Sequence, residues 1–147
     1  TKSGCSVDGS NRLIITNPAS APTTATYTFS NYIDTSAVRV ARVELLTKMI
    51  RIDNSAATFD TFTGLFDSLG GLFDDLSGGS SFADTDVIAY VSTTDDDPAG
   101  SPTWSTYKRF KASDFSGRAF RFKVDLNSES NNVTPALIEL TGRVRYN

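Results

Sequence analysis

Three consecutive aspartates, Asp95, Asp96 and Asp97, are the residues whose type and spacing could most readily support chemistry in this chain. Carboxylates this close together can bind a cation, exchange protons or cap the backbone of a turn. A regular calcium loop alternates its ligands around a glycine, whereas here the carboxylates are adjacent and Pro98 follows them. We therefore predict a turn without a metal, with a low-affinity calcium site at Asp95 and Asp97 as the alternative.

Enzymatic chemistry is not indicated by the rest of the composition. The chain contains no histidine, which removes the commonest general base near neutral pH and the commonest zinc ligand. Its 17 Asp and Glu residues form many nominal pairs, but no pattern singles out two of them for hydrolysis. The sequence has neither a nucleophile elbow nor a phosphate-binding loop. We expect no enzymatic activity and no cofactor, and a hydrolase is the least favoured hypothesis.

Two arginines, Arg118 and Arg121, complete the set of candidate ligand- or partner-contact residues that begins with the three aspartates. They lie in the segment SDFSGRAFRFKVDL, whose alternation places Phe120 and Phe122 on one face and Arg121 on the other. The arginine stems could simply cover an apolar surface of a core strand. Alternatively, an arginine at the rim of a sandwich could contact a carboxylate or hydroxyl group of a glycan.

The elements that must position these residues are β-strands. Alternating apolar and polar residues predict strands over 11–17, 24–35, 86–94, 104–112, 118–126 and 134–147. Within 37–53 the alternation changes after Ala41, which predicts a bulge or a corner between strands, with a helix as the alternative. Strands joined by turns of Gly, Pro, Asp and Ser predict an all-β fold. We expect an antiparallel, jelly-roll-like β-sandwich of about eight strands.

The same alternation predicts which side chains form the core. We expect the following residues to be largely buried: Phe120, Phe122, Val124, Tyr90 or Ile88, Val40 and Trp104. The aspartates should lie in an exposed connection between the strands 86–94 and 104–112, because turn-forming residues are concentrated between them.

The length of 147 residues suits one domain, and we predict a single β-sandwich over 1–147. Residues 58–84, rich in Phe, Asp and Gly, should form a long packed loop, with a binding or subunit-contact loop as the alternative. The net charge of −3 and the absence of a long apolar run indicate neither a nucleic-acid partner nor membrane insertion. Cys5 is the single cysteine and can form no intrachain disulfide. The start at Thr1 suggests a fragment or a processed piece of a larger protein.

Four motifs follow one another in the second half of the chain: DVIAYVSTT, WSTYKRF, DFSGRAFRFK and VTPALIEL. In this order they resemble a domain of the tail-tip (host-specificity, lambda-type tip attachment) proteins of long-tailed bacteriophages. The resemblance covers about residues 58–147. The order of a Trp followed by Arg-aromatic-Arg is also similar to discoidin-type, galactose-binding-like sandwiches.

The resemblance implies a non-enzymatic virion module of the tail tip or tail fibre that is structural and takes part in host-surface attachment. Its implied partners are other virion tail proteins and a host cell-surface glycan or protein receptor, and it would assemble as a homotrimer. The alternative is a free-standing carbohydrate-binding β-sandwich, secreted or held at a cell surface. A tail-tip module should be trimeric, whereas a binding module can be monomeric and should retain a sugar.

Overall fold

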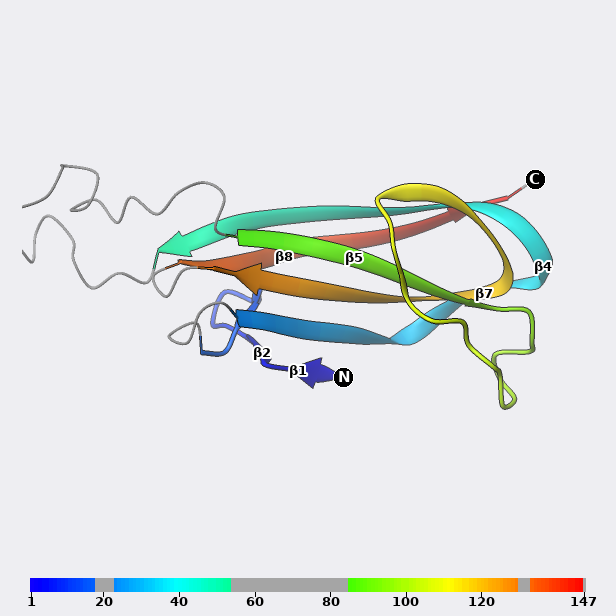
Figure 1. The fold of residues 1–147 in the computed structure, drawn as a ribbon, viewed down its shortest axis with the longest axis horizontal. Helices are drawn as coiled ribbons and strands as arrows, with labels where there is room; N and C mark the ends of the chain where they lie inside the picture. Colours follow the sequence, from blue (N-terminus) through cyan, green and yellow to red (C-terminus); the bar gives the residue numbers. More distant parts are fainter. Residues whose placement is uncertain (18–22, 54–84, 130–132, 147) are drawn as a thin grey trace, which may run out of the picture.

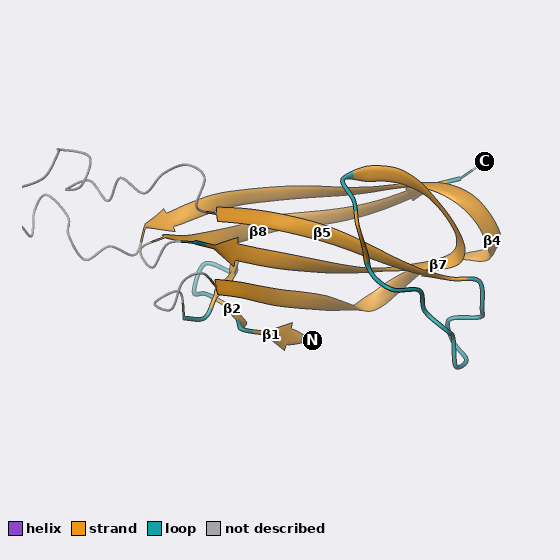
Figure 2. Ribbon diagram, viewed as in Figure 1, coloured by secondary structure: helices purple, strands orange, loops and turns teal. Residues whose placement is uncertain are grey.

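All regular elements of the described structure are β-strands (Figure 2). The structure, a computed structural model, describes residues 1–17, 23–53, 85–129 and 133–146. The strands are β1 (Lys2–Ser3), β2 (Cys5–Val7), β3 (Leu13–Ile15), β4 (Thr23–Asp53), β5 (Thr85–Thr94), β6 (Lys108–Arg109), β7 (Ala112–Ser128) and β8 (Val133–Arg145). The all-β prediction is confirmed, and the alternative of a helix within 37–53 is wrong. The loop predicted over 58–84 lies outside the described residues.

Hydrogen bonds join these strands into one antiparallel sheet. The order is β2-β3-β8-β4-β7-β5-β6, and β1 pairs with β4 beside this path. The predicted antiparallel pairing is therefore confirmed, while the sandwich and jelly-roll arrangements stay predictions. Among the residues that the structure describes, no helix is long and apolar enough to span a membrane.

The central strand, β4, has a different main neighbour along each of its two halves. Residues 23–44 pair with β7, and residues 42–53 pair with β8. Figure 1 shows β4 running along the molecule, turning at one end and returning beside β8. A single 31-residue strand thus belongs to both parts of the sheet.

Polar side chains build the bend of β4, where its pairing with β7 shifts register. Ser36 adopts a positive φ of 65°, and its N–H donates to Asp34 Oδ1 over 2.8 Å. The Thr35 hydroxyl lies 2.8 Å from the carbonyl oxygens of both Ala37 and Arg118. The bend therefore satisfies backbone groups that the regular ladder leaves unpaired.

The alternation predicted to change after Ala41 does not change there. Pairing with β7 continues without a register shift over residues 39–44, so Ala41 and Val43 share one buried face. Val40 lies on the opposite face and is 71% exposed, which makes the prediction of its burial wrong. Because both faces of this stretch carry apolar side chains, the sequence alone did not distinguish the inner face from the outer one.

The hydrophobic core is built around β7. Phe120, Phe122 and Val124 are buried, as predicted, whereas Tyr90 and Ile88 on β5 are only half-buried. The other buried apolar side chains of the cluster are Cys5, Ile15, Ala25, Ala41, Val43, Leu45, Ala89, Val91, Phe110, Leu126 and Leu137. Alternate residues of β7 thus face the core, and the intervening ones are free to build a surface.

The strand predicted over 104–112 is much shorter than expected. Only Lys108 and Arg109 pair with β5 there, as β6, and β7 begins at Ala112. Trp104 lies in the irregular segment before β6 and is half-buried, so the prediction of its burial is also wrong. Its ring packs against a cationic side chain of β7 instead of entering the core.

Candidate functional site

The three aspartates form an exposed turn directly after β5, as predicted. The Asp97 carbonyl accepts the Gly100 N–H over 3.1 Å, and Asp97 Oδ1 accepts the Ala99 N–H over 3.0 Å. Asp96 Oδ2 accepts the Thr103 N–H over 2.7 Å and so closes the wider loop. Two of the carboxylates therefore cap backbone donors, which is the usual work of Asp in turns.

Arg118 fastens this turn to the bend of β4. Its Nη2 lies 3.2 Å from Asp97 Oδ2, and its Nε lies 3.2 Å from Asp34 Oδ1. The hydrogen bond from Arg118, followed by that from the Ser36 N–H, lowers the pKa of Asp34. The same pairing with Asp34 raises the pKa of Arg118. The side chain predicted as a ligand contact thus serves as an internal clamp between two carboxylates.

A row of alternating cations and aromatic rings covers the outer face of β5 and β7. We call it the cation–aromatic ladder, and it consists of Tyr90, Trp104, Tyr107, Arg121 and Lys123. Arg121 Cζ lies 4.5 Å from the ring centroid of Trp104 and 5.1 Å from that of Tyr107. Lys123 Nζ lies 4.2 Å from the Tyr90 centroid and 5.7 Å from the Tyr107 centroid. These distances are those of cation–π contacts.

Hydrogen bonds fix both cations of the ladder from below. Arg121 Nε donates to the hydroxyl of the fully buried Ser92 over 3.3 Å. Lys123 Nζ donates to Asp125 Oδ2 over 3.2 Å, and Asp125 Oδ1 accepts the Thr26 hydroxyl over 2.7 Å. Both cations project from alternate positions of β7, opposite to the core residues. The ladder is therefore a rigid surface with its side chains already ordered.

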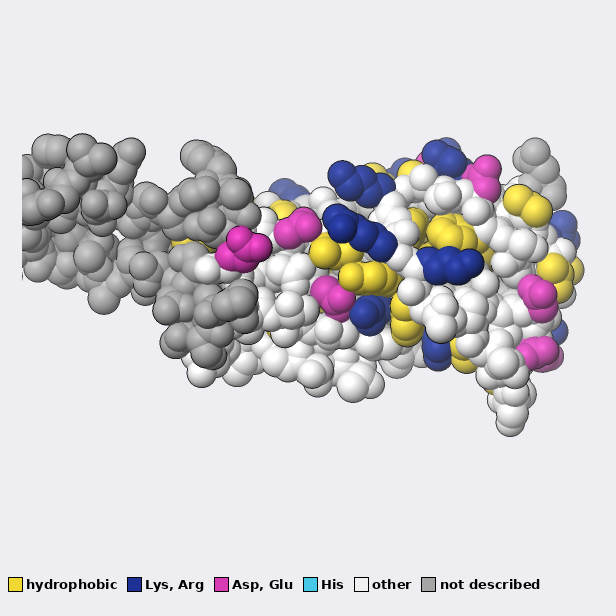
Figure 3. All heavy atoms as spheres, viewed as in Figure 1, with side chains coloured by type: hydrophobic (Ala, Val, Ile, Leu, Met, Phe, Trp, Pro, Cys, Tyr) yellow, Lys and Arg dark blue, Asp and Glu magenta, His cyan; other side chains and the backbone are white. Residues whose placement is uncertain are grey.

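The two tyrosines of the ladder have phenols whose pKa is raised. Burial raises the pKa of Tyr107, while the positive charge of Arg121 opposes that change. Burial also raises the pKa of Tyr90, and the nearby Asp125 carboxylate adds to it. Both phenols are thus neutral near neutral pH. Figure 3 shows Lys and Arg side chains lying beside hydrophobic ones over the region where Figure 1 places β5.

A cavity of about 450 Å³ lies between the aspartate turn and the ladder. Its lining includes the carboxylates of Asp95 and Asp96, the indole of Trp104, and the hydroxyl-bearing residues Ser105 and Ser116. Ser116 comes from β7, and the other four come from the connection that follows β5. The cavity thus combines hydrogen-bond acceptors with an aromatic edge.

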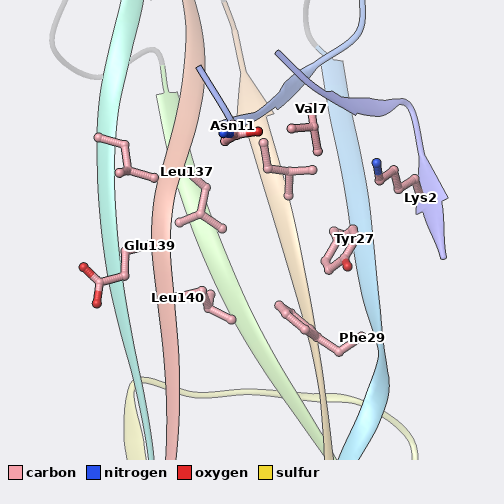
Figure 4. A pocket seen from close by; sticks show the side chains of 10 residues that line it. Lys2, Val7, Asn11, Tyr27, Phe29, Leu137, Glu139 and Leu140 are labelled. Carbon is pink, nitrogen blue, oxygen red and sulfur yellow. The ribbon is translucent and has the colours of Figure 1, made fainter. Parts of the chain in front are cut away.

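A second hollow, of about 270 Å³, opens between the first part of β4 and β8 (Figure 4). Tyr27 and Phe29 line it from β4, and Leu137 and Leu140 line it from β8. Leu137 belongs to the buried core, and the other three pack against it. Lys2, Asn11 and Glu139 also line the hollow. It is therefore an open flank of the core with three polar residues in its lining.

The structure brings the five candidate residues into one region. Asp97 pairs with Arg118, while Asp95 and Asp96 share a cavity with the tryptophan on which Arg121 stacks. Sequence reasoning missed the other four ladder residues and the second partner of Arg118, which are Tyr90, Trp104, Tyr107, Lys123 and Asp34. The alternation that placed Arg121 outward also places Lys123 on the same face, so part of the ladder was predictable.

Comparisons with known proteins returned no relatives. Neither the protein-family models, nor the curated proteins, nor the solved structures contain a match to this chain. Within the described ranges, no group of three or more His, Cys, Asp or Glu side chains is arranged to hold a metal ion. The site must therefore be interpreted from its own geometry.

Proposed function

We propose that the protein is a non-enzymatic module of the tail tip or tail fibre of a long-tailed bacteriophage, structural in role and involved in attachment to the host surface. One observation carries this proposal: residues of two motifs on which the resemblance rests meet on one surface. The motif WSTYKRF supplies Trp104 and Tyr107, and the motif DFSGRAFRFK supplies Arg118, Arg121 and Lys123. A rigid surface of aromatic rings and cations suits adhesion better than catalysis.

The proposal has a direct test. Genes for a tail hub, a tape measure or tail assembly proteins should flank the coding region, and antiserum against the chain should label the tail tip of purified virions in electron micrographs. Sedimentation equilibrium should give a homotrimer. Flanking genes unrelated to a virion, together with virions that remain unlabelled, would show that the proposal is wrong.

A free-standing carbohydrate-binding module is the second candidate, and the cavity beside the aspartate turn favours it. Aromatic and carboxylate groups around one cavity can orient a sugar without neighbouring chains. Such a module should sediment as a monomer and retain a glycan on an array. A trimer in sedimentation, together with a coding region flanked by tail genes, would favour the virion module instead.

A further inference from the structure

The cavity between the aspartate turn and the cation–aromatic ladder has the size of a small-ligand site. Its volume is about 450 Å³, and ligand pockets commonly measure about 300–1,000 Å³. All the residues that line it are described, and they come from the end of β5, the connection after it and β7. The cavity is therefore built on the paired strands β5 and β7 and on the connection that follows β5.

The hydrogen-bonding capacity left open in the cavity consists of carboxylate oxygens. Among the described residues, no donor lies within bonding distance of the Asp95 carboxylate, whereas Asp96 uses Oδ2 for the Thr103 N–H. Two adjacent carboxylates thus keep acceptor oxygens for a ligand. Neutral O–H donors on neighbouring carbons of one molecule would satisfy them through charge-assisted hydrogen bonds.

The indole of Trp104 supplies an apolar surface on the same cavity. Arg121 already lies over this ring, 4.5 Å from its centroid. Arg121 occupies one face of this ring, so its charge would repel a second cation at the cavity, whereas the weakly polar C–H groups of a sugar ring can pack on the indole surface that lines the cavity. The arrangement therefore favours a neutral ligand over an amine.

The charge of the cavity also disfavours acidic sugars. Asp95 and Asp96 carry their negative charges at its rim, and both are exposed. The nearest clamp cation, Arg118, is already paired with Asp97 and Asp34. A carboxylate on the ligand would thus meet two like charges, and the other nearby cation, Arg121, already lies over Trp104 and donates its Nε–H to Ser92.

We propose that this cavity binds one residue of a neutral saccharide. Adjacent hydroxyl groups of the sugar donate to Asp95 and Asp96, and its apolar face packs on Trp104. The inference rests on the proposed function and names the class of receptor group that the module recognises. Whether the protein belongs to a virion is decided separately, by flanking genes and tail labelling, so the two proposals can fail independently.

The experiment uses the fluorescence of Trp104, which is the only tryptophan of the chain. The full chain is titrated with D-galactose, D-glucose, D-mannose and N-acetyl-D-glucosamine, each to high millimolar concentration. We expect a saturable change with at least one of them. Asp95→Ala should weaken that binding about tenfold or more, because it removes a charge-assisted hydrogen bond.

The matched control is Asp86→Ala, which removes the same charge from the opposite end of β5. Asp86 is exposed and does not line the cavity, so its replacement should leave the affinity unchanged. Far-UV circular dichroism and the melting temperature check that both variants fold. If Asp95→Ala does not fold, Ser116→Tyr takes its place. The larger side chain fills the cavity and should abolish binding.

Four outcomes would overturn the proposal. The first is the absence of a saturable change with all four sugars. The second is an equal loss of affinity in Asp95→Ala and Asp86→Ala. The third is binding of D-glucuronate as tight as that of the neutral sugars, which would contradict the charge argument. The fourth is saturation by spermidine alone, which would assign the cavity to amines.

Discussion

Each cation of the site contacts more than one partner, and these contacts determine how available its side chain is to a ligand. Arg118 lies between two carboxylates, and Arg121 lies between two rings above a buried hydroxyl. Side chains ordered in this way have already lost their rotamer freedom, so a ligand that meets them does not have to order them. The open carboxylates of Asp95 and Asp96 are the more available ligand groups.

We expect replacement of Asp34 by Asn to reduce the sensitivity of the fold to acid. The pKa of Asp34 is lowered, chiefly by the hydrogen bond from Arg118. Because the folded pKa is depressed, the carboxylate stabilises the fold above its ordinary pKa of about 4, and this contribution disappears as the pH falls through the folded value. Asp34→Asn should therefore lower the melting temperature clearly at about pH 7 and much less at about pH 3.

Thermal melts at both pH values provide the measurement. Asp114→Asn serves as the control, because the Asp114 carboxylate forms only an exposed pair with Arg42. Its effect should be small at either pH. An equal loss of stability at both pH values in Asp34→Asn would show that the pairing of Arg118 with Asp34 makes no pH-dependent contribution to the stability of the fold.

Calcium should not bind to the aspartate turn in the millimolar range. Both Asp97 oxygens are occupied, one by the Ala99 N–H and the other by Arg118, so an ion would have to displace a cation. Calorimetric titration of the full chain is expected to give no saturable heat. Binding that is lost in the double variant Asp95→Asn/Asp97→Asn would restore the alternative of a calcium site.

Local chemistry made the turn predictable, whereas its clamp was not. The aspartates, Pro98 and Gly100 specify a turn within a few residues, and the structure places a turn there. Arg118 and Asp34 are 84 positions apart, so only the pairing of β4 with β7 brings them together. A single sequence carries no local signal for such a pair.

At the scale of elements, β4 differs most from what the sequence indicated. The two segments 24–35 and 37–53 were expected as separate elements, but they form one strand that bends between them. The alternation in β5 and β7 is regular because one face is buried, so these strands were predicted well. In β4 apolar side chains occupy both faces near the bend, and the pattern becomes ambiguous.

The hydroxyl of Thr35 should contribute measurably to that bend. It is buried and lies 2.8 Å from the carbonyl oxygens of Ala37 and Arg118. Thr35→Val keeps the shape of the side chain but leaves these groups without their donor, which should cost about 1–3 kcal/mol in the free energy of unfolding.

Urea denaturation would measure this cost. Thr47→Val is the matched control, since Thr47 lies on the same strand and is exposed, and it should change stability by less than about 0.5 kcal/mol. Equal costs in the two variants would mean that the bend does not depend on the Thr35 hydroxyl.

For the whole molecule, the shared β4 predicts a single cooperative unfolding transition. Leu137 on β8 is 6% exposed, and its neighbour Ile138 faces outward and is 41% exposed. Leu137→Ala should cost about 2–5 kcal/mol, whereas Ile138→Ala should cost less than about 1 kcal/mol. Because β4 pairs with both β8 and β7, the loss of stability in Leu137→Ala should also destabilise the strands β5 and β7.

Two signals recorded in the same denaturation test this coupling. Circular dichroism reports all strands, and the fluorescence of Trp104 reports only the surface beside β5 and β7. In Leu137→Ala both midpoints should shift together. A fluorescence midpoint that stays at the value of the parent protein would divide the fold into two independent units.

The position of β4 in the chain also governs how the protein is made. On a translating ribosome β4 is complete at Asp53, but β7 begins only at Ala112 and β8 only at Val133. At synthesis rates of roughly 5–20 residues per second, β4, the longest of the described strands, waits several seconds for both of its main partners. During that time the nascent chain presents strand edges that can pair with neighbouring chains. Its yield in cells should therefore depend on a chaperone that holds β4 until the C-terminal strands emerge.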